Sequence, residues 1–423
     1  MIKQPPYEVY ATDFFSVNRW ILKCAGLWPP STPNRVVRRL YQLYTIGVFL
    51  FVNLWFTGTE FVSLFYTYKS QYELIKNVNF FLTHFMGAVK VILWYFYGHL
   101  LRDIMNALES PQLHYEGYAD FSPHRISHLH RAIGRRYSLL FLCLAHATLI
   151  SSYIPPLIAV AEYLNQPQGG LQKLPSRLPY FCWMPFSYDT PGKYLLAVAY
   201  QAGPMFSYAY SVVGMDALFM NILNCIAENM VLIQGAFKTV RERSTLHYCV
   251  GALAPPCDAI REHPLVLRQM DLETKKIIKH LQITLRACKH LEGIYHIITL
   301  SQVTATLFIL CTSLYLISTA SPFSKQFFAE LVYMMAMLFE LFLYCWFGNE
   351  VTLKYEQLPM HIWESQWLAT DDCFKKQMIF TMLRTNRPVY FTAGKLARLT
   401  LPTFMSILKT SYSIFALIKN FSK

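Results

Sequence analysis

Residues 137–161, YSLLFLCLAHATLISSYIPPLIAVA, form a stretch of 25 residues that contains no charged side chain. A helix needs about 20 apolar residues to cross the hydrocarbon core of a bilayer. The same requirement is met, with at most two charged residues in each segment, by residues 40–66, 77–101, 194–227, 294–324, 331–347 and 400–421. The sequence therefore predicts an all-α membrane protein whose single domain, residues 1–423, has seven transmembrane helices.

The composition supports this prediction. The chain is 54% hydrophobic and only 15% charged, whereas a water-soluble protein is about 25% charged. A net charge of +13 could indicate binding to nucleic acid. The cations gather in the segments between the apolar stretches instead, so membrane lipid is the expected surrounding and nucleic acid is not an expected partner.

The placement of these cations predicts the orientation of the chain. The N-terminal segment and every second connection after it carry 28 lysines and arginines, against eight in the alternate segments when Lys419, near the end of the seventh span, is counted with the C-terminus. Positively charged connections stay in the cytoplasm. The N-terminus is therefore expected in the cytoplasm and, after seven crossings, the C-terminus outside.

Charged residues within the apolar segments are costly and invite a functional explanation. Lys90 and Asp216 lie at mid-depth to inner depth of the second and fourth segments and could pair across them. A structural pair, or a polar contact that faces water, is favoured over a direct role in function. Glu60 and Glu340 are placed near segment ends, where they are expected to reach interfacial water.

The seventh segment carries a repeating pattern that places six side chains on one helical face. The spacings alternate between three and four along Thr403, Ser406, Thr410, Ser413, Leu417 and Asn420. A stripe of small hydroxyls that ends in a bulky apolar residue suits a pore with a hydrophobic gate. Close packing between helices explains the same stripe equally well. A pore would require several subunits around an axis.

The outer halves of the second, third, fourth and sixth segments are rich in aromatic, methionine and small polar residues. Such a mixture suits a pocket for a small apolar ligand, although ordinary helix packing is the alternative for any one residue. The candidates are Phe80, Phe81, Thr83, His84, Ile150, Ser151, Tyr153, Met205, Phe206, Phe328 and Tyr333.

The sequence contains no nucleophile, phosphate-binding or zinc-protease motif, so an enzyme is not predicted and no metal or cofactor is expected. His124, His128 and His130 lack a metal-ligand spacing and indicate a solvated helix beside the membrane. Cys182 stands alone among the segments expected outside, so no extracellular disulfide is predicted.

Several short motifs in the last third of the chain resemble those of the insect odorant receptors. They are GNE at 348–350, WESQW at 363–367, RTNRP at 384–388, TAGK at 392–395 and LKTSYS at 408–413, followed by Phe415. Asp216, followed by Leu218 and Phe219, is also similar to the fourth span of that family.

This resemblance implies a ligand-gated, non-selective cation channel in which four subunits surround one pore lined by the last helix. It further implies an odorant bound in the outer half of each subunit and subunit contacts through the cytoplasmic regions 230–293 and 348–399. The gate would fall on Leu417, with Asn420 and Phe421 beside it. The sequence is more like a ligand-tuned subunit than the shared co-receptor, so a co-receptor partner in a heterotetramer is implied. The expected location is the dendritic or ciliary plasma membrane of olfactory sensory neurons.

Three other classes of membrane protein fit the sequence less well. Gustatory receptors are close relatives, but Ser411-Tyr412 and Lys419-Asn420 depart from their final-helix pattern. A G-protein-coupled receptor needs its N-terminus outside, which the distribution of charge opposes. A transporter would favour inverted repeats and broken helices, and the sequence shows neither.

Overall fold

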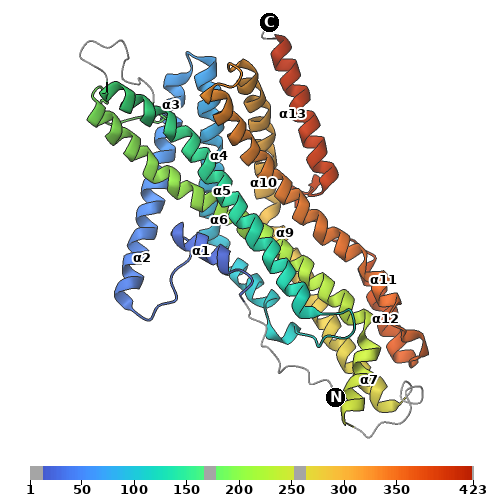
Figure 1. Ribbon diagram of the computed structural model, residues 1–423. Coiled ribbons are helices and arrows are strands. Elements are labelled where there is room, and N and C mark those ends of the chain that lie inside the picture. Colours follow the sequence, from blue (N-terminus) through green and yellow to red (C-terminus); the bar gives the residue numbers. More distant parts are fainter. Residues whose placement is uncertain (1–12, 166–177, 252–262, 422–423) are drawn as a thin grey trace.

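The computed structural model describes residues 13–165, 178–251 and 263–421 and is almost wholly helical (Figure 1). Within these residues, seven helical stretches are long and apolar enough to cross a membrane. This finding confirms the predicted seven-helix architecture. The first crossing is a continuous series of α2 (Arg35–Val48), the π-helical segment η1 (Phe49–Phe56) and α3 (Thr57–Thr67).

The other six crossings are long helices. They are α4 (Gln71–Leu108), α5 (Pro123–Leu164), α6 (Pro191–Lys238), α9 (Pro264–Thr319), α10 (Lys325–Glu356) with its continuation α11 (Leu358–Trp363), and α13 (Leu401–Phe421). The shorter elements are α1 (Ser16–Cys24), η2 (Pro111–Leu113), α7 (Val240–Gly251), η3 (Trp367–Ala369), α12 (Asp372–Thr385), and the strands β1 (Thr392–Ala393) and β2 (Ala397–Arg398).

The starts of these helices follow from local sequence. Pro123, Pro191 and Pro264 each stand at the beginning of a helix, where the missing N–H of proline costs nothing. The hydroxyl of Ser324 accepts a hydrogen bond from the Phe327 amide and caps α10. The predicted fifth span, residues 294–324, extends past the end of α9 at Thr319. The helix ends before the predicted span does, because Pro322 disfavours helical backbone in the residue before it.

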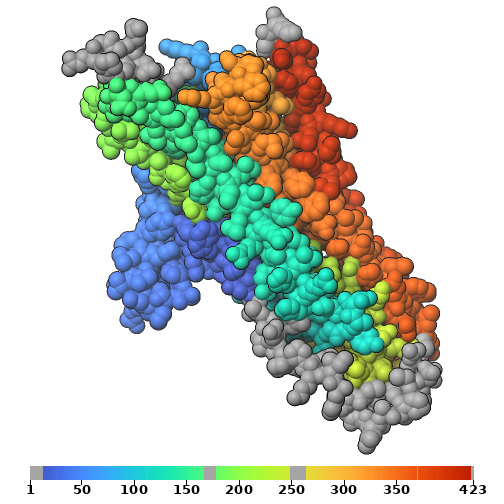
Figure 2. Space-filling model, viewed as in Figure 1, coloured from blue at the N-terminus to red at the C-terminus, as the bar shows by residue number. Residues whose placement is uncertain are grey.

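The helix α6 lies at the centre of an elongated bundle and is buried along most of its length. It packs against α1, α4, α5, α9 and α10 (Figure 1). The molecule has two distinct ends, which we call the α3 end and the α12 end after the elements found there. The helix α2 projects away from the other long helices, and α13 lies at the margin of the bundle on α9 and α10 (Figures 1 and 2).

A buried group of charges joins three helices near the middle of the bundle. Lys90 Nζ lies 2.6 Å from Asp216 Oδ1 and 3.3 Å from Glu340 Oε1. The hydroxyl of Tyr344 donates to the same Asp216 oxygen at 2.7 Å. The predicted Lys90–Asp216 pair is thus confirmed. The expectation that Glu340 reaches interfacial water was wrong, because α10 extends well beyond the apolar segment and places Glu340 deep within the bundle.

A small hairpin, β1–β2, holds the start of α13 against α9. The backbone N–H of Thr392 donates to Glu292 Oε2 at 3.0 Å, and the Thr392 hydroxyl contacts the same carboxylate. Gly394 has a φ of +62°, which favours glycine. A side chain at Gly394 would also collide with Leu300, because a Cβ there would lie 2.5 Å from Leu300 Cδ2. These contacts give a physical reason for the TAGK motif.

We expect the substitution Lys90→Met to lower the stability of the protein strongly, because it leaves two buried carboxylates without their cation. Breaking a buried ion pair in this way typically costs about 3–5 kcal/mol. The measurement is the temperature at which the detergent-purified protein stops eluting as a single species. Lys69→Met changes an exposed lysine and is the control. Equal melting temperatures for the two variants would contradict this prediction.

Candidate functional site

A cavity opens between α4, α5, α6 and α10 in the half of the bundle toward the α3 end. The space between its walls is about 610 Å³, which includes the part that opens to the surroundings. The wall is mostly apolar and includes a few hydroxyls and one imidazole. It is formed by Phe80, Thr83, His84, Phe141, Ala145, Thr148, Leu149, Tyr180, Met205, Tyr208, Ala209, Val212, Val213, Tyr333, Ala336 and Met337.

Part of the predicted ligand-binding set lies in this wall, namely Phe80, Thr83, His84, Met205 and Tyr333. The rest of the set lies outside the wall. Tyr153 is buried behind Tyr180, 5.6 Å between ring centroids. The hydroxyl of Ser151 donates to a carbonyl of its own helix, and Phe81 contacts neighbouring phenylalanines. Three side chains are exposed on the bundle surface, namely Ile150, Phe206 and Phe328.

Helical periodicity could have found most of the wall residues that the sequence analysis missed. On α6, Met205, Tyr208, Ala209 and Val212 recur with the spacing of one helical face. Phe206 is adjacent to Met205 in sequence, yet it points to another side of the helix. On α5 the same spacing relates the wall residues Phe141, Ala145, Thr148 and Leu149.

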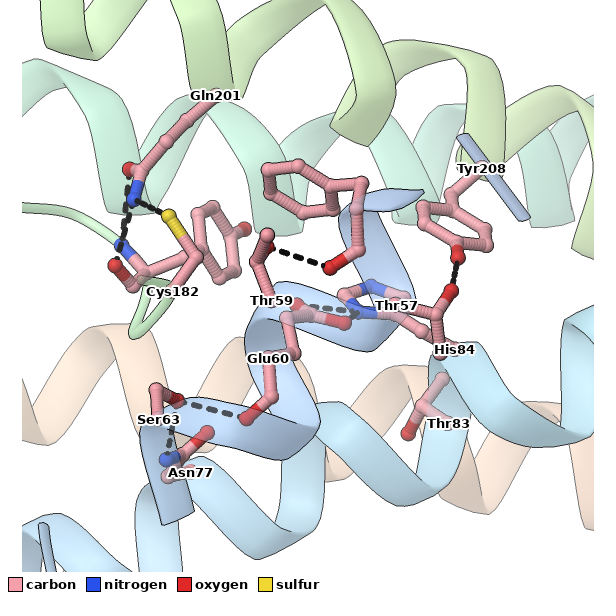
Figure 3. Close-up of polar contacts among 12 residues, drawn as sticks. Thr57, Thr59, Glu60, Ser63, Asn77, Thr83, His84, Cys182, Gln201 and Tyr208 are labelled. Atoms are coloured by element: carbon pink, nitrogen blue, oxygen red, sulfur yellow. Dashed lines mark hydrogen bonds and ion pairs between the residues drawn. The ribbon is translucent and has the colours of Figure 1, made fainter. Parts of the chain in front are cut away.

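The imidazole of His84 forms the polar part of the cavity wall together with Glu60 behind it (Figure 3). Its Nδ1 lies 2.8 and 2.9 Å from the two carboxylate oxygens of Glu60. The ring stacks on Tyr208, with 4.4 Å between centroids and 17° between planes. Glu60 is only 1% exposed. The expectation that Glu60 reaches interfacial water was therefore wrong, because α3 packs against α4 and turns Glu60 inward.

The hydroxyls in the wall are held by fixed partners. The Tyr208 hydroxyl donates to the Val52 carbonyl in η1 at 2.9 Å and contacts the Thr57 hydroxyl (Figure 3). The hydroxyls of Thr83 and Tyr333 lie 2.8 Å apart and link α4 to α10. These contacts keep the side chains of the wall in defined positions before any ligand arrives.

A second, more polar hollow lies toward the α3 end and shares one wall residue with the cavity, Tyr180. Gln201 fixes the backbone of Tyr180. Its Nε2 donates to the Tyr180 carbonyl at 2.7 Å, and its Oε1 accepts from the Tyr180 amide at 3.3 Å. The Tyr180 ring packs edge-on against Phe80, 4.9 Å between centroids. Tyr180 therefore separates the hollow from the cavity.

The predicted stripe on α13 faces away from the rest of the chain. Ile407 and Ser411 are buried on the opposite side of the helix. The stripe residues Ser406, Thr410, Ser413, Leu417 and Asn420 are exposed, and Thr403 is half-buried. Lys409 is also exposed, and the side chain of Phe421 lies outside the described part of the structure. Among the described residues, no other part of the chain covers this face or encloses a pore with it.

The histidines of the HRISHLH segment lie at the start of α5 and differ in exposure. His124 and His128 are exposed, whereas His130 is half-buried and its Nδ1 lies 2.8 Å from the side-chain oxygen of Asn224. Burial lowers the pKa of His130. The prediction of a solvated segment therefore fails for His130.

Comparison with known proteins places the chain among odorant receptors. The family model described as 7tm odorant receptor matches residues 71–412. Odorant receptors 83a and 94a of Drosophila melanogaster are 25% and 24% identical to this chain over 274 residues. The matched part covers 60% and 65% of the lengths of these two receptors, which is less than two thirds. Odorant receptor 59a of the same species is 24% identical over 90% of this chain and 91% of its own.

Solved structures show the same fold. The insect olfactory receptor OR5 from Machilis hrabei aligns with a TM-score of 0.75 at 14% identity, covering 96% of this chain and 97% of its own. The structure of the same receptor in complex with eugenol aligns with a TM-score of 0.76, covering 96% of this chain and 98% of its own.

We expect Tyr180→Ala to join the hollow and the cavity, because the side chain that separates them is removed. In a background that carries a cysteine in place of Ala209 in the cavity wall, a membrane-impermeant thiol reagent should then react several-fold faster. Tyr66→Ala changes a residue of the hollow that does not line the cavity and is the matched control. An unchanged rate in the Tyr180→Ala variant would show that another side chain closes the cavity.

Proposed function

This chain belongs to the 7tm odorant receptor family, and we propose that it is the ligand-tuned subunit of an odorant-gated, non-selective cation channel. In this proposal a small apolar odorant occupies the cavity between α4, α5, α6 and α10. Its binding changes the packing of the bundle and opens a pore lined by α13 from several subunits.

The observation that carries the proposal is the cavity itself. It is mostly apolar, has few polar groups, and these are fixed by hydrogen bonds, as in pockets that bind and orient small ligands. The OR5 receptor, which shares this fold, has a structure in complex with eugenol. That complex supports the assignment of a small organic ligand to this chain.

The exposed face of α13 supports the pore. Leu417 is 56% exposed in the single chain, and the hydroxyls of Thr410 and Ser413 donate to carbonyls of their own helix. An arrangement of four chains would turn these faces toward one axis. Leu417 would then form the hydrophobic gate, with Asn420 and Phe421 beside it.

The partner that we propose is the odorant receptor co-receptor, in a heterotetramer with this subunit. The regions assigned to subunit contact are residues 230–293 and 348–399, of which 252–262 lie outside the described residues. Exposed apolar side chains on α11 and α12 are compatible with such a contact. They include Met360, Trp363, Phe380 and Leu383.

The orientation belongs to the same proposal. With the N-terminus in the cytoplasm and the C-terminus outside, the α3 end faces the extracellular side and the cavity lies in the outer half of the membrane. The α12 end then lies in the cytoplasm, where most lysines and arginines between the spans are found. The location proposed is the dendritic or ciliary plasma membrane of olfactory sensory neurons.

The experiment that tests the function is current recording from cells that express this chain with and without a co-receptor. We expect odorants to evoke a cation current only in cells that express both proteins, and the current to persist when G-protein signalling is blocked. A current that requires G proteins would instead favour a G-protein-coupled receptor. Tastant responses without a co-receptor would favour the gustatory alternative.

Epitope tags at the two termini test the orientation. In unpermeabilised cells, we expect antibodies to reach a C-terminal tag and not an N-terminal one. Permeabilisation should expose the N-terminal tag and serves as the control. Staining of the N-terminal tag on intact cells would contradict both the orientation and the channel proposal.

Substitutions on α13 test the pore. We expect Leu417→Ala to raise the basal current, because it removes the apolar constriction, and Ser413→Lys to reduce cation permeation by placing a positive charge in the pore. Tyr412→Ala changes an exposed residue outside the stripe and should leave basal current and selectivity unchanged. If both stripe variants behave like Tyr412→Ala, the stripe has a packing role and the gate lies elsewhere.

A further inference from the structure

We propose that Glu60 and His84 form a specificity device that selects ligands with an uncharged hydrogen-bond acceptor, such as the oxygen of a ketone, aldehyde or ester. The inference rests on the proposed function, because it assumes that the cavity is where the ligand binds. It goes further by naming a chemical feature that the ligand must carry and the atom that recognises it, His84 Nε2.

The first step concerns the partners of Glu60. Its carboxylate lies on α3, is almost completely buried, and is in contact with His84 Nδ1 through both oxygens. Within the described residues, no other side chain forms a hydrogen bond or ion pair with this carboxylate. Ser63 is a near neighbour, but its hydroxyl donates to the Glu60 backbone carbonyl (Figure 3).

The second step concerns the proton that the two side chains share. A buried carboxylate without compensation is very costly, so the pair must be neutral overall. One neutral state is a carboxylate beside an imidazolium, and another is a carboxylic acid that donates to Nδ1 of a neutral imidazole. A third, a carboxylic acid that accepts from Nδ1–H, is disfavoured because its own O–H would have no acceptor among the described residues. The first two states leave a proton on His84 Nε2. The neutral pair therefore presents an N–H donor at Nε2, wherever the shared proton lies.

The third step concerns the direction of that donor. His84 lines the cavity, and the stacked Tyr208 ring together with Glu60 fixes the plane of the imidazole. Nδ1 is used by Glu60, and Nε2 forms no hydrogen bond within the part of the chain that the structure describes. Nε2 is therefore the polar atom of this ring that remains for a ligand in the cavity.

The other polar side chains of the wall already have partners. Thr83 and Tyr333 contact each other, Tyr208 donates to the Val52 carbonyl, and the Thr148 hydroxyl donates to the Leu144 carbonyl at 3.1 Å. A ligand that offers one acceptor to His84 and an apolar body to the rest of the wall therefore satisfies this cavity. A pure hydrocarbon of the same shape would leave the Nε2–H without a partner.

The probes for the test are two pairs of similar shape, acetophenone with isopropylbenzene and 2-heptanone with 2-methylheptane. The measurement is the ligand concentration that gives half-maximal thermal stabilisation of the purified receptor in complex with its co-receptor. A hydrogen bond to a charged or strongly polarised donor corresponds to about a tenfold difference in affinity. We expect each ketone to bind the unsubstituted complex about tenfold more tightly than its hydrocarbon partner.

Two substitutions test this preference while the cavity keeps its shape: Glu60→Gln should reduce it, and His84→Phe should abolish it. Glu60→Gln lets the imidazole adopt either neutral tautomer, so Nε2 is no longer held as a donor. His84→Phe removes the donor, and should weaken ketone binding while hydrocarbon binding stays the same or tightens. If a single variant fails to fold, Glu60→Leu combined with His84→Phe removes both members of the buried pair, so neither is left without the other. Glu330→Gln changes a buried carboxylate that pairs with Lys76 outside the cavity, and is the matched control.

The inference is overturned if the ketones show no advantage over the hydrocarbons, if neither class binds, or if Glu330→Gln changes the preference as much as Glu60→Gln does. Current recording separates this failure from that of the proposed function. A ketone preference in binding without any ligand-evoked current would support the donor at His84 and contradict the channel. Equal currents from ketones and hydrocarbons, unaffected by His84→Phe, would support the channel and contradict the donor.

Discussion

The contact between Lys90 and the two carboxylates of Asp216 and Glu340 is the constraint around which the bundle is arranged. Lipid offers no water to a charged group, so a lysine in the middle of a crossing helix must find its counter-charges within the protein. Here they come from α6 and α10, so three helices are fixed at one depth. The two carboxylates and the Tyr344 hydroxyl then define how α6 and α10 face each other.

The cavity depends on the same packing. Above the charged group, α4 and α6 approach closely at Gly87, where a Cβ would lie only 2.7 Å from Val212 Cγ2. Toward the α3 end, bulky aromatic side chains and the loop around Tyr180 hold the helices at a distance and leave a space between them. Most polar groups beside that space form pairs across helices, such as Thr83 with Tyr333 and His84 with Glu60. The cavity therefore has a fixed shape, because these contacts also stabilise the bundle.

Much of the fold could be predicted from the sequence, because hydropathy and helix length alone determine the number of crossings. The pairing of Lys90 with Asp216 could be predicted from their similar depth in the membrane. The burial of Glu60 and Glu340 could not, because their distance from the ends of the apolar segments does not show how far the helices extend beyond those ends. The cavity wall was only partly predicted. Composition does not distinguish Met205 from Phe206, although helical phase does. No sequence pattern indicates that Tyr180 lines the cavity, because its position depends on a loop that is held by Gln201, 21 residues further along the chain.

The π-helical segment Phe49–Phe56 determines where the first crossing can change length as this protein diverges over generations. A π-turn closes over one residue more than an α-turn, so the loss of one codon there would allow the backbone to return to α-helical closure and would keep Glu60 near His84. A deletion between this segment and Glu60 would instead rotate Glu60 about the helix axis by about 100° and turn it away from His84. Insertions and deletions at that point are therefore disfavoured. Point substitutions in the cavity wall remain the route by which descendants of this gene could acquire new chemical preferences.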